Sequence, residues 1–450
     1  MDRREFIRRT GAGTAGSLAL QSSGKTLWAA NPGLASVPPS DRVRVGIIGP
    51  GMRGLQDAGS LLTVPGAELV MAADVYDDRL TRVKEVFGES LATTKEYRRL
   101  LDRKDIDAVL VATHDPWHKR IVVEAMESGK DVYCEKPMTY KIEEGFEIIA
   151  AESRYNRILY VGSQGVSSPL VQMAKRWIEE GRLGQITQVK SWENRNTPTG
   201  ACYYPITPDV SEDQLDWKTW LGPSRQVPFD PRRYFRWRIY WDYSGGMATD
   251  LGVHYLSTLH YLLGEAAPRS ATCYGGSYRW KNIYPETEIP DVVNVLYEYP
   301  NFIFNLSITL NSQTQETGTL FMGTKGTVLL DGVKMAFYPE QKLDAYGWIV
   351  NAWPRAKQMQ FLKANNLTGL DQAWAPGSCT APEKYEQYDI VGNPTDLHMK
   401  NFVDSIRTRK PSLEGAVAAH NAVVGGHIAN LSYKQGSRKV TWDGKQAKVA

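Results

Sequence analysis

The chain has 450 residues, which is long enough for two domains of ordinary size, each with its own core. Its composition is 42% hydrophobic and 23% charged with a net charge of +3, so neither nucleic acid nor an anionic membrane is favoured as a partner. The four cysteines show no Cys-x-x-Cys spacing, which argues against a structural zinc site or a disulfide framework. We therefore expect no metal site.

The first thirty residues are typical of an export signal. A segment at 3–9 that carries four arginines precedes a short, weakly apolar run, which ends at Leu20 and cannot span a bilayer as a mature helix. The order Arg3-Arg4-Glu5-Phe6-Ile7 resembles the twin-arginine signal, which exports proteins already folded; a disordered basic tail is the alternative. We expect a periplasmic protein with a signal at 1–30 and a linker at 31–42. No other stretch reaches about eighteen apolar residues, so no membrane span is expected in the mature form.

Residues 43–165 alternate between buried strands and helices. Nearly continuous apolar strands in this pattern indicate a doubly wound parallel sheet, the Rossmann arrangement. The predicted strands are 43–48, 67–74, 107–113, 131–134 and 158–162, and the predicted helices are 52–62, 77–87, 116–128 and 141–155.

After residue 165 the pattern changes to strands in close succession, punctuated by Gly and Asn as in antiparallel meanders. We therefore predict a second, α+β domain at 166–435 with a mainly antiparallel open sheet, followed by a tail at 436–450. Helices at 394–408 and 414–434 are expected to pack back on this domain. The segment 340–392 is loop-like and is a candidate lid. The other predicted elements are helices 168–181 and 247–263 and strands 186–194, 291–299, 302–310, 317–322 and 326–331.

A dinucleotide fingerprint follows the first strand. In Gly49-Pro-Gly51-Met52-Arg53-Gly54 the glycines allow a tight turn, close approach of a pyrophosphate and close packing of helix on strand. Asp74 ends the second strand, where a carboxylate would bind the adenosine ribose hydroxyls and repel a 2′-phosphate. The sequence therefore predicts NAD as the cofactor, with NADP less favoured.

Further motifs occur in order along the chain: Ala112-Thr113-His114-Asp115-Pro116-Trp117-His118, Glu135-Lys136-Pro137, and Gly245 to His254 with Asp250 inside it. With the Gly loop and Asp74, they resemble the Gfo/Idh/MocA family of oxidoreductases over residues 43 to 435. The resemblance implies an NAD(P)-dependent oxidoreductase acting on CH–OH groups of carbohydrates. It implies that Lys136, Asp250 and His254 flank the substrate carbon, and that Thr113, Trp117, His118, Glu135 and Gln164 lie on the nicotinamide side. His114 departs from the proline that many members carry, but Asp115 and Pro116 still make a good N-cap and first helical residue.

The implied chemistry fits these residue types. Oxidation of a secondary alcohol requires a base for the hydroxyl proton, and His254 suits that task. Asp250 lies four residues earlier, so on one helix its carboxylate would orient the imidazole. Lys136 would donate a hydrogen bond to the reacting oxygen.

Aromatic and basic residues interleave between 192 and 243. Aromatic faces suit sugar rings, and arginines can bind hydroxyl groups, so we expect a carbohydrate site here. The alternative is that these aromatic side chains pack the segment onto its domain. The substrate residues predicted are Arg236, Trp237, Trp241, Tyr243 and His254.

Three functions remain open. The leading one is a sugar or polyol dehydrogenase whose cofactor stays bound, because free NAD is scarce outside the cytoplasm. The second is redox-neutral glycoside cleavage through a 3-keto intermediate, as in the glycoside hydrolase family 109 branch of the same family. The third is a non-catalytic sensor. This function is disfavoured because the chain has all three catalytic candidates, Lys136, Asp250 and His254. We also expect a homo-oligomer formed through the open face of the second sheet.

Overall fold

The structure is a computed structural model. It describes residues 37–38, 41–197, 199, 202–264, 266–340, 347–369 and 385–450. The predicted signal and most of the predicted linker lie outside these residues. Among the described residues, no helix has the length and apolar character that crossing a bilayer would require.

The N-terminal domain is a six-stranded parallel sheet in the order β3-β2-β1-β4-β5-β6. This confirms the predicted Rossmann domain, and the order reverses between β1 and β4, where such folds bind ligands. Only β3 was missed, because its three residues Ala92–Thr94 carry little apolar signal. The other strands are β1 (Val43–Ile48), β2 (Ala67–Ala73), β4 (Ala108–Val111), β5 (Asp131–Cys134) and β6 (Leu159–Val161).

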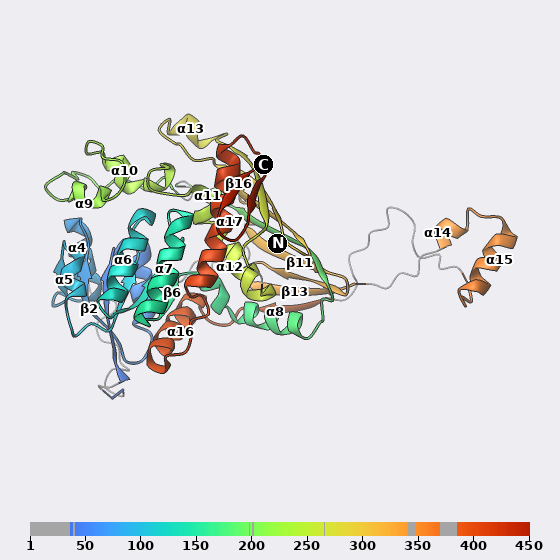
Figure 1. Cartoon of the computed structure of the whole chain (residues 1–450), viewed down its shortest axis with the longest axis horizontal. Coiled ribbons are helices and arrows are strands. Elements are labelled where there is room, and N and C mark those ends of the chain that lie inside the picture. The colour runs from blue at the N-terminus through green and yellow to red at the C-terminus, as the bar shows by residue number, and fades with distance from the viewer. Residues whose placement is uncertain are drawn as a thin grey trace, which may run out of the picture.

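Helices cover both faces of this sheet (Figure 1). One of them comes from far along the chain: Met399, Phe402 and Val403 of α16 (Pro394–Thr408) share a core with strand β1 and helix α3. The expectation that α16 packs on the second domain is therefore wrong. The local helices are α3 (Met52–Leu61), α4 (Asp77–Phe87), α5 (Tyr97–Leu101), α6 (Asp115–Glu127) and α7 (Ile142–Tyr155).

The second domain is a ten-stranded sheet in the order β14-β13-β12-β11-β7-β10-β9-β8-β15-β16. β7 and β10 are parallel and the other neighbouring pairs are antiparallel, as predicted. The strands are β7 (Ile186–Asn194), β8 (Ser270–Gly276), β9 (Val292–Glu298), β10 (Ile303–Thr309), β11 (Thr317–Gly323), β12 (Gly326–Leu330), β13 (Lys334–Pro339), β14 (Glu386–Asp389), β15 (Val440–Trp442) and β16 (Ala447–Val449).

The residues predicted as a tail belong to this sheet. Val440 of β15 is fully buried and pairs with Ala271 of β8, so residues 440–449 extend one edge. The short length of these strands hid them from the periodicity argument. Helices α8 (Pro169–Glu179) and α17 (Ala416–Lys434) contribute to the core on one face, and β9 alternates buried and exposed residues. Assembly through the open face stays a prediction.

The predicted helix 247–263 is two helices. α11 (Gly246–Asp250) ends at Asp250, and α12 (Gly252–Leu263) begins after Leu251. A Cβ on Gly252 would lie 3.0 Å from the Leu306 side chain, so glycine lets the second helix lie close to the sheet. Asp250 and His254 therefore stand on different helices.

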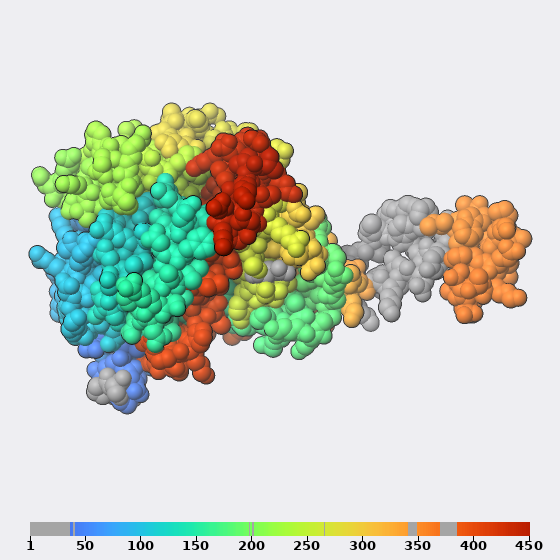
Figure 2. All heavy atoms as spheres, viewed as in Figure 1, coloured from blue at the N-terminus to red at the C-terminus, as the bar shows by residue number. Residues whose placement is uncertain are grey.

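The irregular segment before α11 contains three short helices, α9 (Trp217–Leu221), α10 (Pro231–Phe235) and η4 (Trp237–Ile239). Figures 1 and 2 show this light-green segment lying over the end of the N-terminal domain that carries α4, α5 and α6. By contrast, α14 (Gly347–Val350) and α15 (Arg355–Ala364) project away from both domains (Figure 1). The described part of 340–392 is therefore not a lid over that domain. The remaining short helices are η3 (Gln164–Ser167) and α13 (Trp280–Ile283).

Candidate active site

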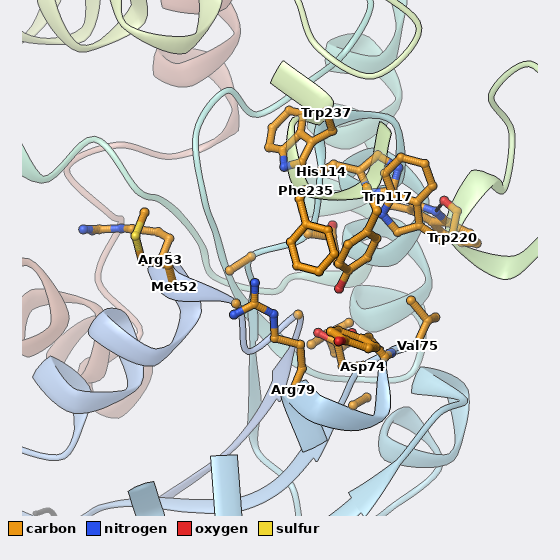
Figure 3. A pocket seen from close by; sticks show the side chains of 18 of the residues that line it. Met52, Arg53, Asp74, Val75, Arg79, His114, Trp117, Trp220, Phe235 and Trp237 are labelled. Atoms are coloured by element: carbon orange, nitrogen blue, oxygen red, sulfur yellow. Dashed lines mark hydrogen bonds between the residues drawn. The ribbon is translucent and has the colours of Figure 1, made fainter. Parts of the chain in front are cut away.

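A cavity of about 630 Å³ lies at the carboxyl ends of β1, β2, β4 and β5, beneath the light-green segment (Figure 3). We call it the cleft. Its N-terminal-domain wall includes the Gly loop, Asp74 and the 112–117 motif, and its other wall is aromatic. Of the predicted site residues, those lining the cleft are Gly49, Gly51, Met52, Arg53, Asp74, Thr113, Trp117, Glu135, Lys136 and Trp237.

The Gly loop has the shape that a bound pyrophosphate requires. Gly49 has a φ of +86°, a conformation that favours glycine. A Cβ on Gly54 would lie 2.5 Å from the Gly49 carbonyl oxygen, whereas the space around Gly51 is open. α3 begins directly after Gly51, so its N-terminus and its free N–H groups face the cleft. These features fit a dinucleotide.

Arg53 joins the Gly loop to the Glu-Lys-Pro motif. Its Nε donates to Glu135 Oε1 at 3.0 Å, and its Nη2 lies 2.7 Å from Asp57 Oδ1. Glu135 Oε1 also accepts from Gln164 Nε2 at 2.7 Å. Burial acts to raise the pKa of Glu135, but the charges of Arg53 and Lys136 outweigh it and lower the pKa to about 2. This ionised carboxylate therefore fixes the backbone that carries Lys136.

Asp74 lies at the cleft wall just beyond β2. Its Oδ1 accepts a hydrogen bond from the backbone N–H of Tyr76 at 3.0 Å, and burial raises its pKa to about 6. Arg79 of α4 rises into the cleft beside it (Figure 3). Arg79 was not predicted from the sequence, although its position in the first turn of the helix that follows Asp74 could have indicated it.

His118 is a structural link. Its Nδ1 lies 2.8 Å from the Pro137 carbonyl oxygen and its Nε2 lies 3.0 Å from the Thr113 carbonyl oxygen. It thus ties two cleft motifs together from behind the cleft wall. Trp117 lines the cleft and donates from Nε1 to the Trp220 carbonyl oxygen at 3.0 Å, which fastens α9 to α6.

Lys136 and Asp250 form a buried ion pair. Lys136 Nζ lies 2.9 Å from Asp250 Oδ1 and 2.6 Å from the Asp250 carbonyl oxygen. Arg238 Nε is 3.4 Å from the same carboxylate oxygen. Burial acts to raise the pKa of Asp250, but Lys136 and Arg238 hold it far below its usual value. The carboxylate is therefore ionised at neutral pH, and it orients the lysine.

His254 is the third predicted catalytic residue. Burial, assisted by the charge of Lys136, lowers its pKa to about 3, so the imidazole is neutral at physiological pH. Within the described part of the chain, no hydrogen bond joins it to Asp250. The expected Asp250–His254 pairing on one helix is wrong. Helix α11 ends at Asp250 and α12 begins after Leu251, and the Asp250 carboxylate points toward Lys136.

The predicted substrate residues divide into two groups. Trp237 lines the cleft. Arg236 instead donates from Nε to the Tyr204 carbonyl oxygen at 3.1 Å, and Trp241 donates from Nε1 to the Glu288 carbonyl oxygen at 3.1 Å. Tyr243 is fully buried against neighbouring rings. These three side chains pack within the segment or fasten it to its own domain, which is the packing alternative.

The segment between residues 192 and 243, which we call the aromatic segment, is fastened to the N-terminal domain. Asp77 N donates to the Gln214 carbonyl oxygen at 3.0 Å, and Asp216 N donates to the Val75 carbonyl oxygen at 3.0 Å. Leu215 forms a β-bridge with Tyr76 between these bonds. The segment therefore closes the cleft from above, a role that no local pattern indicates. Its residues in the cleft wall are Tyr204, Pro205, Thr207, Thr219, Trp220, Tyr234, Phe235, Trp237 and Arg238.

Comparisons with known families agree with this architecture. The family described as an oxidoreductase family with an NAD-binding Rossmann fold, Gfo/Idh/MocA, matches residues 43–163. Its C-terminal alpha/beta domain matches residues 224–441, and a second form of that domain matches 171–272.

Two curated relatives match part of the chain. Inositol 2-dehydrogenase 3 of Saccharopolyspora erythraea is 33% identical over 184 residues, 40% of this chain and 53% of that protein. A glycosyl hydrolase family 109 protein of Shewanella baltica is 33% identical over 169 residues, 34% of this chain and 37% of that protein. The chain thus matches about half or less of these relatives' length.

Solved structures share the fold. Aldose-aldose oxidoreductase from Caulobacter crescentus, complexed with glycerol, has a TM-score of 0.63 at 17% identity, covering 89% of this chain and 100% of that one. Levoglucosan dehydrogenase in complex with NADH and levoglucosan has a TM-score of 0.63 at 17% identity, covering 89% and 99%.

Proposed function

Because the chain belongs to the Gfo/Idh/MocA oxidoreductase family, we propose that it transfers hydride between a tightly bound nicotinamide cofactor and a hydroxyl or carbonyl carbon of a sugar or polyol. The observation that carries the proposal is the buried pair of Lys136 and ionised Asp250 at the wall of a cleft that fits a dinucleotide. Such a pair places a fixed hydrogen-bond donor where a substrate oxygen would develop charge.

Each residue has a part in the oxidation direction. A nicotinamide cofactor held by the Gly loop and Asp74 would supply the hydride acceptor for the carbon that carries the hydroxyl group. Lys136 donates a hydrogen bond to the reacting oxygen, and Asp250 keeps the ammonium group pointed at it. The neutral imidazole of His254 takes the hydroxyl proton. The products are a carbonyl compound, reduced cofactor and a proton on His254.

Sugars are proposed as substrates on two grounds. The aromatic side chains of Trp237 and Tyr204 line the same cleft as Lys136. The family relatives and neighbours include proteins named for inositol, aldose and levoglucosan. The relatives named for glycosyl hydrolase family 109 favour the second candidate, redox-neutral glycoside cleavage.

One survey tests both candidates. Purified protein is mixed with NAD and a panel of sugars and polyols while the absorbance of reduced nicotinamide is followed, and with chromogenic glycosides in parallel. A rise in reduced cofactor with at least one sugar supports the dehydrogenase. Release of the chromophore without net reduction supports redox-neutral cleavage, and neither signal on any compound would contradict both.

We predict that the purified protein carries close to one nicotinamide nucleotide per chain. The segment that covers the cleft is tied to the chain just beyond β2, because Asp77 N donates to the Gln214 carbonyl oxygen and Asp216 N donates to the Val75 carbonyl oxygen, and these bonds would slow release of the cofactor. Denaturing the protein and assaying the supernatant for nucleotide measures the content. Gly54→Ala is the control and should be empty, because its Cβ would crowd the Gly49 carbonyl oxygen. An empty wild-type protein with full activity on added NAD would contradict tight binding.

We predict that Asp74→Ala weakens NAD binding by about 1.5–3 kcal/mol, the contribution of hydrogen bonds to a charged group. It should also reduce discrimination against NADP, because the carboxylate that would repel a 2′-phosphate is gone. With a pKa near 6, the wild-type carboxylate is protonated at lower pH, so its preference for NAD should also decline there. Titrations of both nucleotides measure the ratio, with exposed Asp102→Ala as control. An unchanged ratio removes Asp74 from the ribose site.

We extend the proposal to location and assembly. The arginine pair at residues 3–4 supports twin-arginine export to the periplasm. Tyr274, Leu296 and Ile303 are exposed apolar side chains of the large sheet and support a homo-oligomer through that sheet.

A further inference from the structure

Asp115 is a buried carboxyl group that the proposed mechanism does not use. It follows β4, lines the cleft with Lys136 and Arg238, and is only 2% exposed. The sequence predicts it as the N-cap of α6, but the N-cap is His114, and Asp115 is the first residue of the helix. Its carboxyl group is therefore not occupied by capping.

The carboxyl group is poorly satisfied. Asp115 Oδ2 accepts a long hydrogen bond of 3.4 Å from Gly245 N, and among the described residues Oδ1 has no hydrogen-bond partner. A buried polar atom without a partner costs about 1–3 kcal/mol, so such atoms are rare unless a ligand completes them. Asp115 lines the cleft together with its neighbours His114 and Trp117, which Figure 3 labels at the cleft wall.

The surroundings keep this group in its neutral form. Burial is the main cause that raises the pKa of Asp115 to about 8, and the negative charge of Asp250 adds to it, while Arg238 and Lys136 act in the opposite direction. Cys134 and Tyr140 are the other titratable groups that sense its charge, and burial raises the pKa of each, so both are uncharged at neutral pH. Two carboxyl groups in one site thus differ, since Asp250 is ionised and Asp115 is protonated. Environments that separate two carboxyl groups in this way mark an acceptor and a donor.

We propose that Asp115 is a second substrate-contacting group, whose carboxylic acid donates a hydrogen bond to a sugar oxygen next to the oxygen held by Lys136. The pair would select substrates with two neighbouring oxygen atoms, as in a vicinal diol or an α-hydroxy carbonyl. This inference rests on the proposed function, and it adds to it the class of substrate. No covalent bond changes at Asp115.

The test compares pH–rate profiles of wild type, Asp115→Asn, Asp115→Ala and the control Asp102→Asn, an exposed carboxylate of the same domain. Asn keeps an N–H donor of the same shape, so kcat at neutral pH should stay within about 10-fold of wild type. Ala removes the donor and should lower kcat by about 10²–10³-fold, the effect of losing one such donor. Wild-type activity should decline as pH rises through about 8, and this descending limb should be absent in Asp115→Asn. Wild-type kcat in Asp115→Ala, or an unchanged limb in Asp115→Asn, overturns the proposal.

Two further measurements do not depend on turnover. Infrared difference spectra between wild type and Asp115→Asn should show the C=O band of a neutral carboxylic acid, and saturating substrate, or a panel polyol when none is turned over, should shift it. In thermal unfolding, wild type should lose stability relative to Asp115→Asn as the pH rises from about 4 to 8. The reason is that the pKa of Asp115 is higher in the folded than in the unfolded state, so ionisation is penalised in the folded state. A missing or unshifted band overturns the proposal, as does a stability difference that does not change with pH. If no sugar is turned over but the band is present and shifts, the proposed function fails and the role of Asp115 as a donor stands.

Discussion

Replacing His254 by alanine should lower kcat by about 10²–10⁴-fold, the usual contribution of a general base, while the content of bound NAD stays at the wild-type level. The imidazole would act on the substrate hydroxyl, and His254 is not among the residues that line the cleft beside the Gly loop and Asp74. Because its pKa is lowered to about 3, the proton-accepting form is present at all pH values well above 3. Activity should therefore show no loss from His254 until the pH falls toward that value.

His260→Gln is the matched control for this variant. His260 is a buried histidine on the same helix, α12, and its Nε2 lies 2.8 Å from Tyr299 Oη within the sheet domain. Its replacement should lower thermal stability and leave kcat per folded molecule unchanged. Near wild-type turnover in His254→Ala would take the histidine out of the mechanism. Lys136 would then be the leading base, acting as a neutral amine in a desolvated pocket.

The sequence predicted the elements whose signal is local. The parallel strands of the N-terminal domain are nearly continuous apolar runs, and β7 was predicted with its correct ends because alternation persists over nine residues. The Gly loop and Asp74 line the cleft because turn geometry and strand ends depend on adjacent residues. Lys136 and Asp250, both of which the family resemblance places at the substrate, form an ion pair although 114 residues separate them.

What could not be predicted depends on contacts between distant segments. The break at Leu251 follows from how α12 packs on β10, where Gly252 lies against Leu306, and helical spacing alone cannot show it. The aromatic segment carries the composition of a sugar site, but its placement over the cleft depends on pairing of Leu215 with Tyr76. Asp115 was predicted to cap α6 because an aspartate before a proline is typical of that position. The sequence does not reveal that His114 is the cap, or that an oxygen atom of Asp115 has no hydrogen-bond partner among the described residues.

The ion pair of Lys136 and Asp250 leads to the second large expected effect. From the sequence alone, Asp250→Asn would be mild, since it keeps the shape and only loses support for His254. In the structure the carboxylate faces Lys136 at 2.9 Å and Arg238 at 3.4 Å. Removing its charge leaves two buried cations without their counterion, which costs on the order of 3–5 kcal/mol of folding stability.

We therefore expect Asp250→Asn to lower kcat by about 10²-fold or more, as much as Lys136→Ala, because both leave the reacting oxygen without an oriented donor. The double variant should be little worse than either single one, since residues that act as a unit are not additive. Asp242→Asn is the matched control: it breaks the 3.1 Å pair with Arg233 in the same segment but outside the cleft. It should lower thermal stability while kcat and bound NAD stay unchanged. If the two single losses simply multiply in the double variant, Asp250 acts on the reaction by a route other than Lys136.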